Sequence, residues 1–142
     1  MERRRVPCVG AVVHDADGRI LLVRRGQEPA QGRWSVPGGR VEAGETDAAA
    51  TAREVLEETG LAVSVHELVG IVERDAPDGS VYAISDYRCR LSPDADPASA
   101  AAGDDAAEVG WFTPDEVRAL DCAPRLVEAL DGWGVLDDRG SG

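Results

Sequence analysis

The segment GRVEAGETDAAATAREVLEETGL, residues 39–61, decides the fold of this chain. A stretch free of proline and glycine follows Thr46 and runs to Thr59, and Gly60 comes next. Threonine is a common residue before the first helical turn, and glycine is common just after the last one. The segment therefore predicts a helix over residues 46–59.

One face of this predicted helix is acidic. At about 100° per residue, Glu54, Glu57 and Glu58 fall within an arc of about 100°, so we expect their carboxylates to converge. The expected packing face on the opposite side consists of Ala48, Ala52, Val55 and Leu56. Carboxylates this close repel one another unless cations neutralise them, and such oxygen ligands favour Mg²⁺ or Mn²⁺. The alternative is a solvated acidic face, which is usual for an isolated Glu-x-x-Glu-Glu pattern.

The spacing within residues 39–61 resembles the Nudix box, G-x5-E-x7-R-E-U-x-E-E-x-G-U, in which U is a bulky aliphatic residue. The matching positions are Gly39, Glu45, Arg53, Glu54, Val55, Glu57, Glu58, Gly60 and Leu61. A motif constrained at this many positions is far more specific than a short glycine motif. Residues 32–39 and 111–116 also look like the family's lead-in to the box and its closing strand and helix, so the resemblance covers residues 6–130.

The resemblance implies an α+β fold, an αβα sandwich around a mixed sheet with the box helix packed on it. It also implies an enzyme that hydrolyses a nucleoside diphosphate linked to another group, with water as nucleophile. The implied cofactor is Mg²⁺, for which Mn²⁺ can substitute. The positions that match the family's metal ligands are Glu54, Glu57, Glu58 and the carbonyl of Gly38.

The catalytic positions implied by the resemblance are Glu54 and Glu57, supported by Arg53 and Glu45. In the family the box arginine looks like a partner that holds a box glutamate in position, which also offsets carboxylate repulsion. Which glutamate accepts the proton differs among family members, so this assignment stays open.

Four residues outside these positions are candidates for substrate binding. Only one of Arg24 and Arg25 can face the site, and we favour Arg25 over a solvent-exposed alternative. Trp34 either stacks on a base or packs beneath the box. Asp105 and Glu108 precede the closing strand, where many family members place an extra carboxylate, and the alternative for both is a solvated loop.

Outside the box, turn chemistry and apolar runs predict the remaining elements. Residues 6–14 and 19–25 flank a strong turn and are expected to form a hairpin, and residues 61–74 and 81–91 a second one. A short strand is expected over 108–112, followed by helices that open at Pro114 and Pro124. Residues 1–131 are expected to form a single domain, with 132–142 as a flexible tail.

Composition excludes several classes of protein. The 142 residues carry a formal net charge of −12, which argues against a nucleic acid polymer as partner. No apolar run reaches membrane-span length, and three cysteines without a Cys-x-x-Cys pair fit a reducing compartment. We therefore expect a cytoplasmic protein without membrane contact whose partner is a small-molecule nucleotide. A homodimer is an open alternative to a monomer.

Two function hypotheses remain at this point, a pyrophosphohydrolase and a non-catalytic Nudix-fold module that binds nucleotides or regulates. The box favours the enzyme, because a pure binding module has no need to keep all three helix glutamates. The chain is similar to small bacterial MutT-like and ADP-ribose-pyrophosphatase-like members. ADP-ribose and nucleoside triphosphates, oxidised purines included, both stay open as substrates, because a fold does not fix the substrate.

Overall fold

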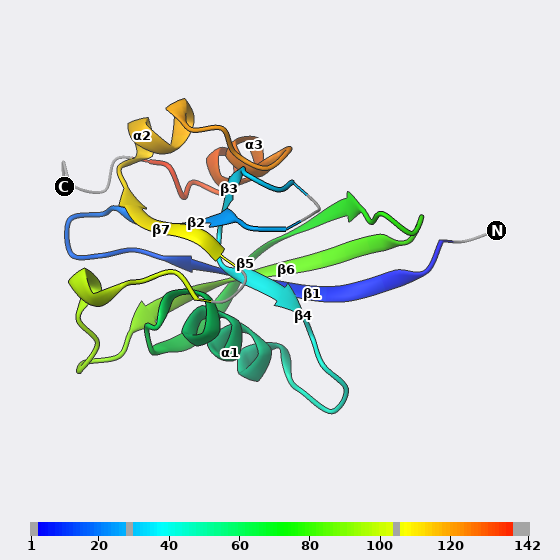
Figure 1. Cartoon of the computed structure of the whole chain (residues 1–142), viewed down its shortest axis with the longest axis horizontal. Coiled ribbons are helices and arrows are strands. Elements are labelled where there is room, and N and C mark those ends of the chain that lie inside the picture. The colour runs from blue at the N-terminus through cyan, green and yellow to red at the C-terminus, as the bar shows by residue number, and fades with distance from the viewer. Residues whose placement is uncertain (1–2, 28–29, 104–105, 138–142) are drawn as a thin grey trace.

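The computed structural model describes residues 3–27, 30–103 and 106–137. Figure 1 shows a sandwich in which α1 lies on one side of the sheets and α2 and α3 lie on the other. The strands are β1 (Arg5–Val13), β2 (Ile20–Arg25), β3 (Trp34–Ser35), β4 (Gly38–Arg40), β5 (Val63–Asp75), β6 (Val81–Leu91) and β7 (Ala106–Phe112). The helices are α1 (Asp47–Thr59), α2 (Pro114–Ala119) and α3 (Leu126–Gly132), with a 3₁₀ turn at Pro97–Ser99. Within these ranges no helix is both long and apolar enough to cross a membrane.

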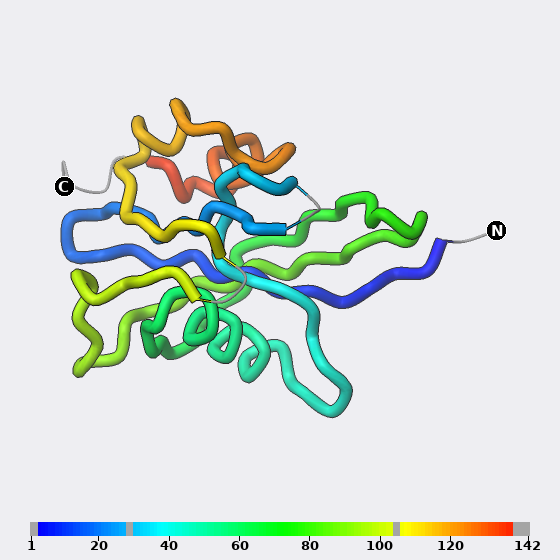
Figure 2. The backbone as a smooth tube through the Cα atoms, viewed as in Figure 1, coloured from blue at the N-terminus to red at the C-terminus, as the bar shows by residue number. Residues whose placement is uncertain are grey.

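Strand β1 is the centre of a mixed four-stranded sheet of order β4-β1-β6-β5. It runs parallel to β6 and antiparallel to β4, while β5 and β6 form the antiparallel hairpin expected from the sequence. The expected αβα sandwich with a mixed sheet is therefore confirmed. The chain path in Figure 2 shows β1 crossing the middle of the molecule.

The expected hairpin of residues 6–14 and 19–25 is wrong. The chain does reverse there, but β2 joins a separate sheet of order β3-β2-β7, and only the single bridge between His14 and Ile20 connects the two arms. The reason is burial, since β1 is buried at every position from Cys8 to Val13. A strand covered on both faces takes partners along both of its edges, and local turn chemistry does not specify those partners.

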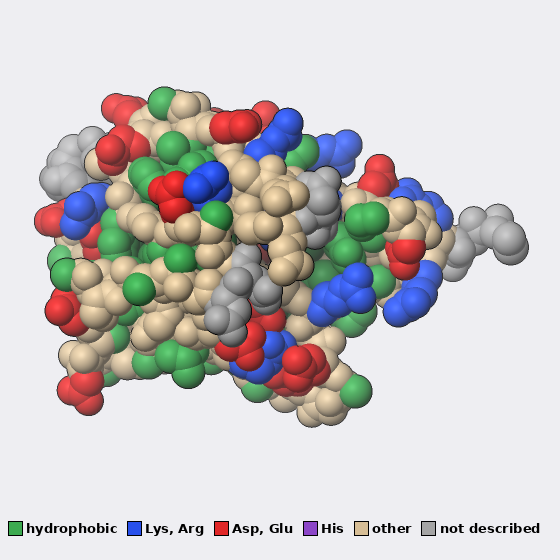
Figure 3. All heavy atoms as spheres, in the orientation of Figure 1, with side chains coloured by type: hydrophobic (Ala, Val, Ile, Leu, Met, Phe, Trp, Pro, Cys, Tyr) green, Lys and Arg blue, Asp and Glu red, His purple; other side chains and the backbone are tan. Residues whose placement is uncertain are grey.

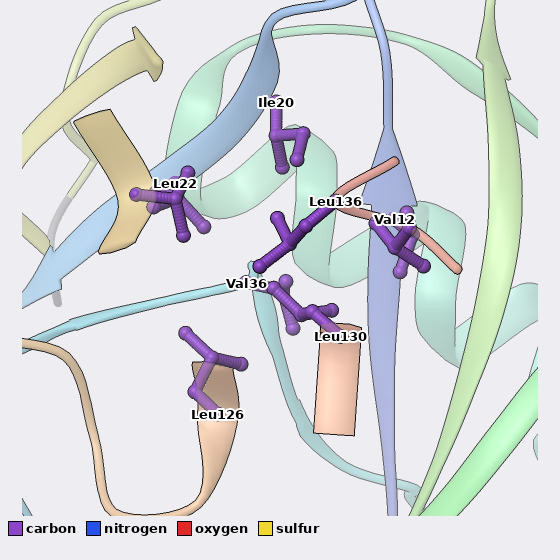
Figure 4. Close-up of a cluster of buried hydrophobic side chains, with 9 residues drawn as sticks. Val12, Ile20, Leu22, Val36, Leu126, Leu130 and Leu136 are labelled. Carbon is purple, nitrogen blue, oxygen red and sulfur yellow. The ribbon is translucent and has the colours of Figure 1, made fainter. Parts of the chain in front are cut away.

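Two apolar cores form on opposite sides of β1. Val12 points to one side, where it packs with Val36 and Leu130 beneath α3 (Figure 4). Ala11 and Val13 point to the other side, against α1. The alternation of side chains along one strand thus fixes α1 and α3 on opposite faces of the same sheet.

Helix α1 has the predicted ends, but it is rotated relative to the predicted packing face. Thr46 accepts a hydrogen bond from the Ala49 amide, and Gly60 ends the helix at φ 76°. The buried residues of α1 are Ala50, Thr51, Val55 and Thr59. Leu56, expected inside, is 54% exposed. The buried face is therefore centred between Glu54 and Val55, which brings the edge of the acidic face against the sheet.

The C-terminal helices extend the packed domain beyond its expected end. Thr113 and Glu116 form the predicted capping box at the start of α2, whereas α3 begins at Leu126, two residues after the predicted proline. Val135 and Leu136 are 1% and 3% exposed and belong to the apolar core. Residues 132–137 are thus part of the packed domain, which corrects the expected boundary at residue 131.

Candidate active site

Arg53 is the centre of a hydrogen-bonded network on α1. Its guanidinium donates to both carboxylate oxygens of Glu45, at 2.7 and 3.0 Å, and to Glu54 Oε1 at 2.7 Å. It also donates to the Arg40 carbonyl at 3.1 Å and to Glu57 Oε2 at 3.3 Å. We call these four side chains, Arg53, Glu45, Glu54 and Glu57, the Arg53 network. Acidic and basic side chains accordingly lie side by side over this region in Figure 3.

The network holds the Glu45 carboxylate in the ionised form. The hydrogen bonds from Arg53, with a further one from the backbone at Glu42, lower the pKa of Glu45 to about 2. The same contacts raise the pKa of Arg53. The two parallel bonds to Glu45 fix the orientation of the Arg53 guanidinium. Its further bond to Glu54 then holds that carboxylate in one position.

Glu54 and Glu58 come together beside β4. A Cβ atom added at Gly39 would lie 2.7 Å from the Glu54 carboxylate, so only glycine leaves room for that side chain. The Gly38 amide donates to Glu58 Oε1 at 3.3 Å. Burial and the hydrogen-bonded Glu54 carboxylate raise the pKa of Glu58 to about 8, because both disfavour a second negative charge at this place.

Glu57 does not join this pair. Its side chain is 59% exposed and is bonded to Arg53. In the ranges that the structure describes, no three His, Cys, Asp or Glu side chains are grouped so that they could hold a metal ion. The predicted convergence of three carboxylates is therefore wrong for this conformation, in which two of the three meet.

The facing pair nevertheless has the chemistry of a divalent-cation site. Both carboxylates are hard oxygen donors, and the raised pKa of Glu58 means that this place favours added positive charge. Glu54 and Glu58 therefore fit Mg²⁺ or Mn²⁺, with the Gly38 backbone beside them and Glu57 on the exposed side.

A cavity of about 340 Å³ lies beside the carboxylate pair. Gly38, Gly39 and Arg40 of β4 line one part of it, next to the box helix, and strands β1, β5 and β6 line another. Arg25 also lines the cavity, and it is the residue that the sequence analysis favoured over Arg24. The carboxylate pair and a ligand-sized space are thus adjacent.

Comparison with known proteins identifies the family. The family model described as NUDIX domain matches residues 4–131. The chain belongs to the Nudix hydrolase family. A MutT-like protein of Streptomyces ambofaciens is 40% identical over 132 residues, which cover 91% of this chain and 79% of that protein. The ADP-ribose pyrophosphatase of Methanocaldococcus jannaschii is 40% identical over 109 residues, or 75% and 61% of the two chains. The fold of the MutT protein from Methanosarcina mazei Go1 is similar, with a TM-score of 0.78 at 21% identity over 94% and 95% of the chains.

Two predicted substrate contacts of this Nudix hydrolase, Trp34 and Glu108, are not found at the cavity. The Trp34 ring packs edge-on against Phe112 with centroids 4.9 Å apart, and Glu108 pairs with Arg24 at 2.5 Å across β2 and β7. Neither Trp34 nor Glu108 is among the described residues that line the cavity. Asp105 lies outside the described residues. The arrangement of Trp34 and Glu108 favours the packing and surface alternatives that the sequence left open.

Sequence reasoning missed four charged residues of the cavity lining, namely Arg40 on β4, Arg74 and Asp75 on β5, and Asp86 on β6. Asp86 is only 3% exposed. A carboxylate in the middle of an apolar predicted strand was the available signal, because aspartate is almost never fully buried without a partner. The predicted strand at residues 81–91 contained that signal. The strand pairing that buries Asp86, however, involves residues that are distant in the sequence.

Proposed function

We propose that this Nudix hydrolase is a Mg²⁺-dependent pyrophosphohydrolase that cleaves a nucleoside diphosphate linked to another moiety. Water attacks phosphorus, and a phosphoric anhydride bond breaks. The observation that carries the proposal is the facing pair of Glu54 and Glu58 beside the cavity, with Glu54 held by Arg53. When Mg²⁺ is bound, it polarises a phosphoryl oxygen and lowers the pKa of a water molecule. Mn²⁺ can substitute for it.

The residues of the chain itself have separable tasks in this proposal. Glu54 and Glu58 hold the cation, while Arg53 and Glu45 keep Glu54 in one orientation. Glu57 remains exposed toward solvent, where it can complete the ion's coordination or accept a proton. Its bond to Arg53 is the longest of the Arg53 network, at 3.3 Å, so it is the member whose displacement breaks the weakest contact.

The cavity supplies positive charge for the substrate's phosphates. Arg25 and Arg40 line it close to β4, and Arg40 is fixed from one side by Tyr82, whose hydroxyl accepts from Arg40 at 3.1 Å. The Arg40 guanidinium also lies 5.4 Å from the centre of the Tyr82 ring. A diphosphate between the carboxylate pair and these arginines would place the remaining group of the substrate over strands β1, β5 and β6.

The substrate is proposed at the level of its class. The similar protein from Methanocaldococcus jannaschii is named an ADP-ribose pyrophosphatase, which supports ADP-ribose as one candidate. Nucleoside triphosphates, including those with oxidised purines, are the other. A small-molecule nucleotide in the cytoplasm is the expected partner in both cases.

The decisive experiment is hydrolysis of a nucleotide panel in ¹⁸O-labelled water with Mg²⁺. ADP-ribose should give AMP and ribose 5-phosphate, and a nucleoside triphosphate should give the monophosphate and pyrophosphate. The label should appear on a phosphate-containing product and never on a sugar carbon. Inorganic phosphate as the sole primary product would indicate a terminal phosphatase instead. Tight binding without turnover would favour the non-catalytic module.

The metal requirement has an independent test. An ion that binds only the folded protein raises its melting temperature by mass action, so millimolar Mg²⁺ or Mn²⁺ should stabilise the wild type. The same ions should have a smaller effect on Glu58→Gln, because the amide removes one of the two facing carboxylates. If neither ion shifts the wild-type melting temperature and EDTA leaves hydrolysis intact, the carboxylate pair holds no required metal.

A further inference from the structure

The strands under the cavity form a floor that is apolar in the middle and charged toward both ends. Cross-strand pairing of β1, β6 and β5 aligns three rows, namely Gly10 with Asp86 and Gly70, Cys8 with Ile84 and Val72, and Val6 with Tyr82 and Arg74. We call these three rows the cavity floor. Asp86 stands in the first row and Arg74 in the third. The side chains of Ile84 and Val72 separate them with an apolar surface.

Asp86 lies between two glycines of the neighbouring strands. Its strand neighbours are Gly10 on β1 and Gly70 on β5. A Cβ atom at Gly10 would lie 2.1 Å from Asp86 Oδ1, and one at Gly70 would lie 2.1 Å from the Trp133 ring. The carboxylate therefore fits only because the adjacent position on β1 has no side chain.

This carboxylate has hydrogen-bonding capacity that the protein does not use. Asp86 is 3% exposed, and its Oδ1 atom has no hydrogen-bond partner among the residues that the structure describes. Within the same ranges, Arg74 Nε is also buried without a partner. Buried polar groups in folded proteins are nearly always hydrogen-bonded, so unpaired atoms lining a cavity are expected to be satisfied by a ligand.

We propose that Asp86 is a specificity-determining residue that accepts hydrogen bonds from the N–H edge of the substrate's base. The base would lie flat on Ile84 and Val72. Arg74 would donate to an acceptor atom on the opposite edge of the base. This inference rests on the proposed function, because the base belongs to the nucleotide whose phosphates meet the carboxylate pair. It adds the recognition of a planar heterocycle that carries an amino group.

The size of the cavity supports one such group. Small-molecule sites span about 300 to 1,000 Å³, so a volume of about 340 Å³ is near the lower end and suits a single ring system with part of its sugar. Base edges carry adjacent N–H donors and carbonyl or ring-nitrogen acceptors, and carboxylates pair with the amino groups. A site whose buried acceptor needs that donor rejects an analogue that lacks it, since the acceptor is then left unpaired.

The test measures binding of nucleoside monophosphates, which are products of both candidate substrate classes. AMP is compared with purine riboside 5′-monophosphate, which lacks the 6-amino group, and GMP with IMP, which lacks the 2-amino group. Titration calorimetry on the wild type should show that one amino-bearing nucleotide binds about tenfold or more tightly than its partner. In Asp86→Asn, that ratio should fall to near one, because the amide presents a donor where an acceptor is needed.

The control is Glu73→Gln, on β5 beside Arg74. The Glu73 side chain is 51% exposed and paired with Arg5, and Glu73 is not among the described residues that line the cavity. This variant should keep the wild-type ratio. A wild type that binds both members of each pair equally, or binds none of the four, overturns the inference, as does a ratio that persists in Asp86→Asn. The wild-type comparison needs no variant, so it stands even if Asp86→Asn does not fold.

The outcomes also separate this inference from the proposed function. Hydrolysis of the nucleotide panel with no effect of the amino group leaves the proposed function standing and removes the role of Asp86. A clear amino-group effect without any hydrolysis leaves the base site standing and removes the proposed activity.

Discussion

Charged side chains are paired with one another in the Arg53 network, whereas on the cavity floor Asp86 and Arg74 have buried atoms without hydrogen-bond partners in the described part of the chain. In the network every carboxylate is bonded to one guanidinium, and the pKa of Glu45 falls to about 2. On the cavity floor, burial without a hydrogen bond raises the pKa of Asp86 to about 7, and the nearby Arg74 guanidinium offsets only part of that effect. Paired charges fix the geometry of the site. Unpaired buried charges leave hydrogen-bonding capacity for a ligand.

The carboxylate pair beside the network gives the largest expected effect. Glu58→Gln keeps the side-chain volume but removes one of the two charges that would hold the cation. We expect turnover to fall about 10²–10³-fold or more, as when a group that stabilises transition-state charge is lost. The melting temperature without metal should stay level or rise, because the amide relieves repulsion between Glu54 and Glu58. Steady-state kinetics and thermal unfolding measure both.

The matched control is Glu67→Gln on β5. Glu67 is 65% exposed and lies 3.5 Å from Arg88, away from the cavity lining. Its substitution should leave turnover unchanged. Near wild-type turnover in Glu58→Gln would remove that residue from the metal site.

Arg53→Lys tests whether the network acts by geometry or by charge alone. Lysine keeps the positive charge but cannot bind Glu45 through two parallel bonds while also holding Glu54. We expect kcat to fall about 10–100-fold, the usual range for losing a partner that orients a ligand. Arg118→Lys is the control, because Arg118 makes one exposed ion pair with Asp131, and it should be silent. Equal kcat in wild type and Arg53→Lys would show that charge alone suffices.

The same variant should change the acid response of the fold. The pKa of Glu45 lies at about 2 in the folded protein because Arg53 binds it, against an ordinary value of 4.5. The pairing therefore stabilises the fold fully above that ordinary value, and the stabilisation is lost as pH falls toward 2. Arg53→Lys should lose less stability over this window than the wild type in chemical denaturation.

Two glycines sharpen the comparison because each makes room for one carboxylate. Gly39→Ala would bring a Cβ within 2.7 Å of the Glu54 carboxylate, and Gly10→Ala would bring one within 2.1 Å of Asp86 Oδ1. We expect Gly39→Ala to lower kcat and Gly10→Ala mainly to raise KM, each by about tenfold, because small displacements at a reacting or binding group have effects of this size or larger. Gly132→Ala, which meets no atom within 4 Å, is the control. The reverse assignment of kcat and KM effects would contradict the division into two regions.

Local signals in the sequence predicted the elements that local chemistry determines. The ends of α1 at Thr46 and Gly60, the capping box of α2 and the β5–β6 hairpin all match, because capping and turn residues act within a few positions. The resemblance to the box likewise implied that Arg53 holds a box glutamate, and in the structure Arg53 bonds to Glu54. These residues lie in one continuous segment whose spacing is fixed by a helix.

Features that depend on distant partners could not be predicted in this way. Strand β1 takes β4 and β6 as neighbours instead of β2, and the rotation of α1 buries Thr51 while exposing Leu56. The Asp86 carboxylate fits at its place only because β1 presents Gly10 beside it. Sequence periodicity predicts which face of a helix or strand a residue occupies. It does not predict which other element packs on that face, because the tertiary fold determines that.

The last expected effect concerns the pH dependence of stability at Asp86. The pKa of this carboxyl is about 7 in the folded protein against an ordinary value of 3.8, so its raised pKa favours folding fully below 3.8. That contribution is lost as pH rises through 7, because the unfolded chain ionises while the buried group resists ionisation. Relative to Asp86→Asn, the wild type should therefore lose free energy of unfolding between pH 4 and pH 7, by at most about 4 kcal/mol.

Arg74 provides the control that ties this loss to the cavity floor. Its guanidinium favours the ionised form of Asp86 and so holds the pKa below the value that burial alone would give. In an Arg74→Gln background, the difference between Asp86 and Asp86→Asn should continue to grow at higher pH than in the wild-type background. Urea denaturation of the four proteins at a series of pH values measures this coupling directly. A difference that is constant from pH 4 to pH 7 would mean that Asp86 ionises as easily when folded as when unfolded, and the contrast with the Arg53 network would then disappear.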